Sequence, residues 1–310
     1  MLRELVVSPI GLGLAALGRP GYINLEHARD VGDHADERSM ELAAHAALDA
    51  AYERGVRHFD AARSYGKAEA FLASWLRERG LGRDDVTVGS KWGYTYTAGW
   101  RADADVHEVK ELTLETLRRQ YAESLELLGP NLRLYQIHSA TLDSGVLDDP
   151  GVLEELARLR EGGLLIGLTV TGPGQAETIE KALAIGGFDT VQATWNVLER
   201  SAGPALAAAH EAGLGVIVKE ALANGRLTER GDVAELGEAA RGAGTTPDAL
   251  ALAVALAQPW ADVVLSGAGT VEQLESNLAA LALAVDPGTL DGLAEDPVRY
   301  WEKRAALPWN

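Results

Sequence analysis

Short apolar runs alternate with longer amphipathic segments along nearly the whole chain. A short run rich in Val, Ile and Leu is typical of a strand buried on both faces, and apolar residues three or four positions apart are typical of a helix with one buried side. This pattern predicts eight strands, over residues 10–17, 58–61, 86–91, 132–138, 165–170, 190–195, 215–220 and 263–268. It also predicts helices over residues 37–54, 111–128, 151–161, 175–185, 203–212, 247–257 and 271–284.

Repeated strand and helix units imply a parallel sheet, and eight such units in 310 residues fit a (β/α)8 TIM barrel that forms one domain over residues 1–310. The competing architecture is a doubly wound open sheet, in which the Gly-rich stretch Gly11 to Gly18 would form a dinucleotide-binding turn. Pro20 follows that stretch where such a turn would open a helix, so we favour the barrel. Long loops over 18–37 and 93–110 are expected at the carboxyl edge of the strands, and an aromatic-rich tail over 286–310 is expected to pack against the domain.

Composition narrows the range of functions. The formal net charge of −18 disfavours binding to nucleic acid and to anionic membranes, both of which require clustered Lys and Arg. Without cysteine there is no disulfide and no thiolate chemistry, and no metal site is predicted. No apolar run approaches the roughly 20 residues of a membrane span, and the N-terminal residues do not resemble a secretory signal. We therefore predict a cytoplasmic protein, whose oligomeric state the sequence leaves open.

Four polar residues stand at or just after the ends of three predicted strands: Asp60 and Tyr65, then Lys91, then His138. In a closed parallel barrel this carboxyl edge is where active sites are built. A tyrosine hydroxyl can protonate an oxyanion when a nearby cation such as Lys91 stabilises the phenolate. Asp60 can hold that lysine, and His138 can orient a carbonyl oxygen. Each residue alone has an ordinary structural explanation, but the four together predict acid catalysis on a carbonyl group.

These residues also carry a family resemblance. The segment FDAARSYG is similar to the FDTAxxYG motif of the aldo-keto reductases, and SKWG and YQIH resemble that family's strand-end lysine and histidine motifs. The resemblance covers nearly the whole chain. It implies an NADP- or NAD-dependent barrel oxidoreductase that reduces an aldehyde or ketone, or oxidises a sugar or alcohol in reverse. It also implies that Asp60, Tyr65, Lys91 and His138 are its catalytic residues, with Tyr65 as the acid and base.

Further motifs resemble the family's cofactor site. IGLTV and VQATWN imply nicotinamide contacts from Thr169 and Gln192, with Trp195 stacking under the ring. KEALANGRL resembles a loop that clasps the pyrophosphate, and LSGAGTVEQLESN resembles the adenosine-binding segment. NADP-preferring members carry a lysine and an arginine at the positions of Gly267 and Gln273, so NAD is plausible here and the preference stays open. The residues implied by these last two segments are Glu220, whose role is unresolved, Leu222, Gly225, Gly267, Ala268, Thr270, Gln273 and Asn277.

Aromatic residues are concentrated in the two long loops and next to the lysine. At the loops of a barrel they can wall a pocket for a small-molecule carbonyl compound or for the apolar face of a sugar. The predicted substrate contacts are Tyr22, Trp92, Tyr94, Tyr96 and Trp100.

Two other functions fit part of the pattern. Lys91 at a strand end could form a Schiff base in a barrel aldolase, with Tyr65 and His138 moving protons. Some members of the family are nucleotide-sensing accessory subunits of membrane channels, a role that needs the cofactor site but not turnover. We place both below reduction, because the cofactor segments describe a nicotinamide site and the acidic composition offers no evident partner patch.

Overall fold

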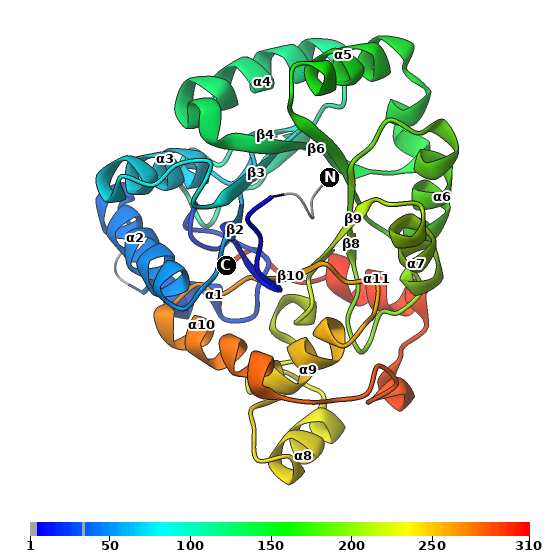
Figure 1. Cartoon of the computed structure of the whole chain (residues 1–310). Helices are drawn as coiled ribbons and strands as arrows, with labels where there is room; N and C mark the ends of the chain where they lie inside the picture. Colours follow the sequence, from blue (N-terminus) through cyan, green and yellow to red (C-terminus); the bar gives the residue numbers. More distant parts are fainter. Residues whose placement is uncertain (1–4, 33–34) are drawn as a thin grey trace.

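The computed structural model describes residues 5–32 and 35–310. Residues 1–4, on which the expectation of no secretory signal partly depends, and residues 33–34 of the first long loop lie outside the described residues. Eight parallel strands close into a barrel in the order β1-β10-β9-β8-β7-β6-β3-β2, and Figure 1 shows helices arranged around it. The strands are β1 (Ile10–Gly13), β2 (His58–Asp60), β3 (Thr87–Trp92), β6 (Leu132–Ala140), β7 (Leu165–Val170), β8 (Thr190–Thr194), β9 (Gly215–Lys219) and β10 (Val263–Ser266).

The barrel closes through β1, which pairs in parallel with β2 on one side and with β10 on the other. The register places Leu12 opposite Phe59 and Ile10 opposite Val264. The prediction of a (β/α)8 barrel is therefore confirmed, and the open doubly wound sheet is excluded. The first strand is shorter than predicted, because the amides of Leu17 and Gly18 turn back onto the Leu14 carbonyl.

The seven predicted helices are present, with differences at their ends, and four helices that were not predicted lie over residues 27–31, 68–79, 234–242 and 297–305. The predicted helix from residue 111 begins at Leu114, because the Thr113 hydroxyl accepts a hydrogen bond from the Thr116 amide and caps it there. The predicted helix over 271–284 ends at Leu278 and continues as a short 3-10 turn. The helices are α1 (His27–Val31), α2 (Glu37–Glu53), α3 (Ala68–Arg79), α4 (Leu114–Leu128), α5 (Pro150–Glu161), α6 (Gln175–Ile185), α7 (Gly203–Glu211), α8 (Ala234–Gly242), α9 (Pro247–Leu256), α10 (Val271–Leu278) and α11 (Pro297–Ala305).

Side chains of the strands divide between two apolar clusters. Successive residues of a strand face opposite sides of the sheet. In β9, Ile217 belongs to a small cluster inside the barrel, whereas Val216 and Val218 belong to the large cluster between barrel and helices. The same alternation in β6 and β10 assigns Leu134, Val263 and Leu265 to the interior. The large cluster anchors the helices, and the small one fills the barrel beneath its carboxyl edge.

Two loops and the tail meet at that edge. The hairpin of β4 (Tyr94–Tyr96) and β5 (Glu108–Lys110) lies within the second long loop. Tyr22 and Asn310 exchange both backbone hydrogen bonds, at 3.0 and 3.2 Å. The ring of Trp309 stacks on His107, with centroids 4.2 Å apart. The predicted packing of the tail is thus confirmed, and its partners are both long loops.

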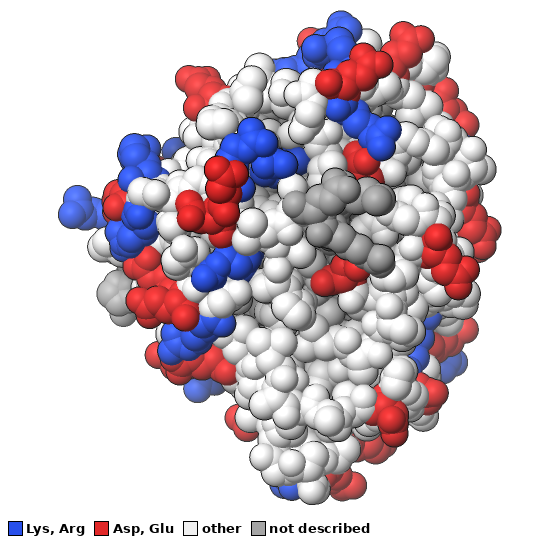
Figure 2. Space-filling view, in the orientation of Figure 1, with Lys and Arg blue, Asp and Glu red and all other residues white. Residues whose placement is uncertain are grey.

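The face of the molecule in Figure 2 carries charges of both signs. Figure 2 shows acidic and basic side chains interleaved on the face drawn, without a continuous basic area. Among the described residues, no helix is both long enough and apolar enough to cross a membrane.

Gly18 offers a test of how the first loop is packed. A Cβ atom there would lie 2.2 Å from the Tyr65 carbonyl oxygen and 2.5 Å from the Ala68 Cβ, both of which belong to the segment after β2. We expect Gly18→Ala to lower the free energy of unfolding by about 1–3 kcal/mol through overpacking. In the control, Gly242→Ala, the new Cβ meets nothing within 4 Å. Urea unfolding curves measure both, and equal stability of Gly18→Ala and the wild type would refute this packing.

Candidate functional site

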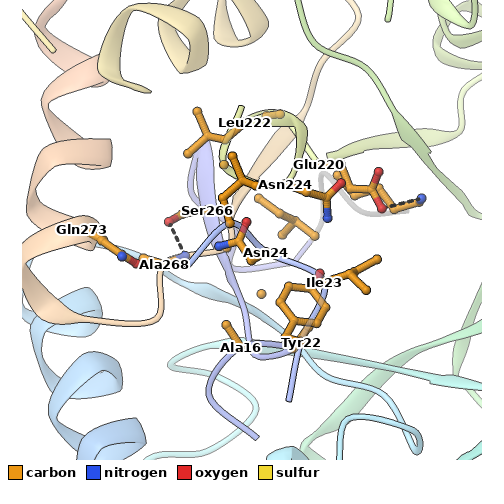
Figure 3. Close-up of a pocket in the computed structure, with 18 of the residues that line it drawn as sticks. Ala16, Tyr22, Ile23, Asn24, Glu220, Leu222, Asn224, Ser266, Ala268 and Gln273 are labelled. Atoms are coloured by element: carbon orange, nitrogen blue, oxygen red, sulfur yellow. Dashed lines mark hydrogen bonds and ion pairs between the residues drawn. The ribbon is translucent and has the colours of Figure 1, made fainter. Parts of the chain in front are cut away.

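A cavity of about 630 Å³ opens at the carboxyl edge of the barrel. One end is lined by Asp60, Tyr65 and His138, and the other by Gly267 of the β10 to α10 connection and by Gln273 of α10. Figure 3 shows Glu220 and Gln273 on opposite sides of this cavity, with Tyr22 and Asn24 of the first loop between them. The cavity is therefore elongated, and the connections that follow β1, β2, β3, β7, β9 and β10 contribute to it.

Side chains alternate between the two faces of a strand, and this alternation explains which residues meet at the cavity. Asp60 pairs with Gly89 across β2 and β3, and Lys91, two residues on, faces the same interior side. On β6, Gln136 and His138 share the face of Leu134, and on β8, Gln192 lies opposite Ile217 of β9. The strands thus bring Asp60, Lys91, His138 and Gln192 together at one end of the barrel.

Asp60 and Lys91 form a buried ion pair at the base of the cavity. The Lys91 ammonium donates to Asp60 Oδ2 and, at 2.9 Å, to the Ala61 carbonyl. The side chains of Lys91 and Asp60 are 1% and 3% exposed. The Gln136 and Gln192 amides approach the other Asp60 oxygen at 3.3 and 3.4 Å. Each side chain compensates the other's charge, and removing either partner would leave a buried charge without its counterpart.

Tyr65 and His138 face each other above this pair, with ring centroids 5.5 Å apart. The Lys91 ammonium lies 4.8 Å from the Tyr65 ring centroid. Burial, and next the charge of Asp60, raises the pKa of Tyr65 well above its ordinary value, so the phenol keeps its proton. Burial, reinforced by surrounding cations, lowers the pKa of His138 well below its ordinary value. The pair therefore presents a protonated hydroxyl and a neutral imidazole to the cavity.

Glu220, whose role the sequence left unresolved, anchors the tail helix. Both of its carboxylate oxygens accept from the Arg304 guanidinium on α11, at 3.1 and 3.0 Å from Nε. Its backbone has a φ of 52°, a left-handed conformation that is uncommon for a residue other than glycine. Burial would raise the pKa of Glu220, but the charges of Arg304 and Lys219 outweigh it and lower that pKa to about 2. Glu220 is thus an ionised docking point for the tail.

The β10 to α10 connection lines the far end of the cavity. The Thr270 hydroxyl accepts from the Gln273 amide at 3.2 Å and caps α10. The Gln273 side chain is held on both sides, accepting from the Gly269 amide and donating to Asp30 of α1, at 2.9 Å each. Asn277 lies 3.0 Å from the Ser266 hydroxyl. This end of the cavity is ordered by short polar side chains.

Most of the predicted site residues line the cavity, and some do not. Lys91 lies beneath it, and the Thr169 hydroxyl accepts from the Ser139 amide at 2.7 Å. Thr270 acts as a helix cap, as described above. The predicted residues that line the cavity are Asp60, Tyr65, His138, Gln192, Glu220, Leu222, Gly225, Gly267, Ala268, Gln273, Asn277, Tyr22 and Tyr94.

Four predicted aromatic contacts have to be corrected. Trp195 follows Thr194 on β8 and therefore points outward, where its ring packs at 5.5 Å against Trp260. Trp92 is one residue past the interior-facing Lys91 and is 0% exposed in the outer core. The Tyr96 hydroxyl accepts from the Trp100 amide, and the Trp100 indole donates to the Ala35 carbonyl. Of the described residues, none of these four lines the cavity.

Other residues of the site were missed by the sequence prediction. Lys219 ends β9 on the interior side, and alternation from Ile217 would have indicated it. Arg19 lies under the rings of Tyr22, Tyr65 and Trp309, with its guanidinium carbon 4.7–5.3 Å from their centroids. It also pairs with Glu108 at 2.8 Å. No local pattern marks Arg19, because Tyr65, Glu108 and Trp309 are all distant from it in the sequence.

Comparison with known proteins places this barrel in a family. The model of the aldo/keto reductase family matches residues 9–293. Two proteins of Bacillus subtilis (strain 168) are similar to the chain, and both are described as uncharacterized oxidoreductases. YrpG is 25% identical over 279 residues, covering 79% of this chain and 84% of its own. YqkF is 22% identical over 306 residues, covering 89% and 88%. The chain belongs to the aldo/keto reductase family and is an oxidoreductase.

Solved structures show the same fold. The aldo-keto reductase AKR11C1 of Bacillus halodurans, in its holo form, superposes with a TM-score of 0.69 at 20% identity, covering 96% of this chain and 92% of that one. PA4992 of Pseudomonas aeruginosa superposes with a TM-score of 0.65 at 24% identity, covering 90% and 92%.

The pair of Glu220 and Arg304 makes a testable contribution to stability. We expect Arg304→Met to lower the free energy of unfolding at pH 7 by about 3 kcal/mol, because it leaves a buried carboxylate without its partner. The folded-state pKa of Glu220 lies below its ordinary 4.5, so the contribution exists above that value and is lost as the pH falls toward 2. Urea unfolding at pH 7 and pH 3 measures this, with the exposed Arg299→Met on the same helix as the control. A loss no larger than that of Arg299→Met would contradict it.

Proposed function

We propose that the protein is an NAD(P)H-dependent reductase of small aldehydes or ketones that prefers NADH, with Tyr65 as its general acid. The observation that carries this is the meeting of Asp60, Tyr65, Lys91 and His138 at one end of a cavity whose other end is built from the β10 to α10 connection. A carbonyl compound fits beside the first group, and a nucleotide fits along the rest.

The residues along the cavity fit a nicotinamide dinucleotide, which supplies a hydride when bound. Gln192 offers an amide to the carboxamide, next to the reacting end. Leu222 and Gly225 line the middle, where the backbone φ of Gly225 is 94° and a side chain would be strained. Gln273 and Asn277 of α10 line the other end, where the adenosine would lie. This set of donors supports the cofactor that the family resemblance implied.

In this proposal, each catalytic residue has a defined task. Tyr65 gives its proton to the carbonyl oxygen as the hydride arrives, and the Lys91 charge stabilises the phenolate that remains. Asp60 holds the Lys91 ammonium in place. His138, neutral at working pH, orients the carbonyl oxygen against the Tyr65 hydroxyl. In this way the Tyr65 hydroxyl, a weak acid, can protonate the weakly basic carbonyl oxygen of the substrate.

The preference for NADH follows from the charges around Gln273. Asp30 accepts from Gln273 and also pairs with Arg230, whose Nη1 lies 2.8 Å from Asp30 Oδ2. Arg230 is therefore neutralised before any ligand binds. Asp248, Glu229 and Glu272 also line this end. A ribose hydroxyl can donate to such carboxylates, whereas a 2′-phosphate would be repelled.

The surroundings of Lys91 argue against a Schiff-base lyase. Its ammonium donates to Asp60 and to the Ala61 carbonyl beneath the cavity, so it is not placed to attack a carbonyl compound. No feature of the described residues favours a channel-accessory role. The cytoplasmic location and the reverse oxidation of a sugar stay predictions.

Tyr65→Phe tests the assigned acid. We expect turnover with an aldehyde panel to fall by at least about 10²-fold, because general acid catalysis is lost. The dissociation constant for NADH, measured by quenching of tryptophan fluorescence, is expected to stay within about twofold. Undiminished reduction by the variant would remove Tyr65 from the mechanism, and loss of NADH binding would show a structural effect instead.

The double variant Asp30→Asn with Gln273→Arg tests the nucleotide preference. Removing the carboxylate and adding a guanidinium is expected to shift the ratio of NADPH to NADH affinity by about 10- to 100-fold toward NADPH. Fluorescence titration with both nucleotides measures the ratio. Asp143→Lys, at an exposed position outside the cavity, makes the same change of +2 in net charge and serves as the control. An unchanged ratio in the double variant would show that other residues read the ribose.

A further inference from the structure

Cations surround the reacting end of the cavity, although the chain as a whole carries a net charge of −18. Besides burial, the charges of four residues lower the pKa of His138: Lys91, Lys219, Arg19 and Lys110. With Arg304, this end holds five cationic side chains against the carboxylates of Asp60, Glu108 and Glu220. A local excess of positive charge in an acidic protein calls for an anionic ligand.

Three of these cations are already engaged. Lys91 donates to Asp60 and to the Ala61 carbonyl, and it does not line the cavity. Arg19 pairs with Glu108 and donates to the Ser64 carbonyl at 2.9 Å. Lys110 donates to the Ser139 carbonyl at 2.7 Å and lies behind Tyr94. None of these has to meet a ligand to satisfy its charge or its hydrogen bonds.

Lys219 is placed differently. It ends β9 on the interior side, lines the cavity and donates to the Thr194 hydroxyl at 3.0 Å. Its nearest carboxylate oxygen, on Glu220, is 3.9 Å away, and that carboxylate is held by both arms of Arg304. Of the lysines in the described chain, Lys219 alone lines this cavity. Its charge is therefore only partly compensated and is directed at the space where a substrate would sit.

We propose that Lys219 binds a carboxylate on the substrate, so that the physiological substrates are aldehydes or ketones that also carry an acid group. This inference rests on the proposed reductase function and names its substrate class. Burial lowers the pKa of Lys219 to about 8, with Glu220 opposing and Arg304 and Lys91 assisting the shift. The ammonium form still predominates at pH 7. A charge-assisted hydrogen bond in a partly buried site discriminates strongly against a neutral analogue.

The same ammonium chemistry would suit an anionic oxygen of the nucleotide diphosphate. The two sources differ in what the loss of Lys219 weakens. If Lys219 binds a substrate carboxylate, its loss lowers kcat/KM for acid substrates relative to their esters. If Lys219 binds the diphosphate, its loss lowers the affinity for NADH whatever the substrate.

The experiment compares wild type, Lys219→Met and Lys219→Arg. The substrates are ω-oxo acids with two to four carbons between aldehyde and carboxylate, each paired with its methyl ester. We expect the wild type to prefer at least one acid over its ester, and Lys219→Met to lower the ratio of kcat/KM for that acid to kcat/KM for its ester by roughly 10- to 100-fold. Lys219→Arg should retain part of the preference. Lys181→Met on α6, which removes the same charge outside the cavity, should behave as the wild type.

Equal use of acids and esters by the wild type would overturn the proposal. So would a loss of NADH affinity in Lys219→Met with an unchanged ratio of acid to ester. Calorimetric titration of the NADH-loaded protein with dicarboxylates of matched length, against the corresponding diamides, needs no turnover. If no aldehyde is reduced but the dicarboxylates bind through Lys219, the anion site stands and the reductase proposal fails. If neither the binding of dicarboxylates nor the reduction of oxo acids changes when Lys219 is replaced, the proposed anion site is refuted.

Discussion

Neighbouring residues of a strand point to opposite sides of the barrel wall, and this constraint decides which side chains can reach the cavity. Asp60, Lys91, His138 and Lys219 share the interior side at the carboxyl edge, so the strands need no special loop to assemble them. Once they are assembled, the ion pair of Asp60 and Lys91 fixes the charge under Tyr65. The polar centre therefore inherits its geometry from backbone hydrogen bonding, the most rigid part of the fold.

The same constraint separates what the sequence could predict from what it could not. Runs of apolar residues were enough for the eight strands, and the ends of those runs were enough to predict Asp60, Lys91 and His138. Trp195 was misassigned because a motif match gives a residue's position along the chain but not the side of the barrel wall that it faces. Trp92 was misassigned because its place next to Lys91 does not give that side either. Lys219 was overlooked although its face could have been counted from Ile217. Arg19 and Arg304 were beyond prediction, because their partners Glu108 and Glu220 lie 89 and 84 residues away.

Charge is distributed unevenly along the cavity. The reacting end is rich in cations, whereas the end at α10 is lined by Asp248 and Glu272, with Asp30 already bound to Arg230. An interior cationic site in an acidic protein gains selectivity because it differs in sign from its surroundings. A ligand that is anionic at one end and neutral at the other would match this gradient along its length.

The backbone pairing of Tyr22 with Asn310 joins segments from opposite ends of the chain across the mouth of the cavity. The tail also carries Arg304, whose partner Glu220 lines the same cavity. The cavity is consequently complete only when the tail is docked, so undocking the tail would also open the cavity. By thermodynamic linkage, any molecule that binds between these walls must tighten the tail by the same free energy by which the docked tail tightens its binding.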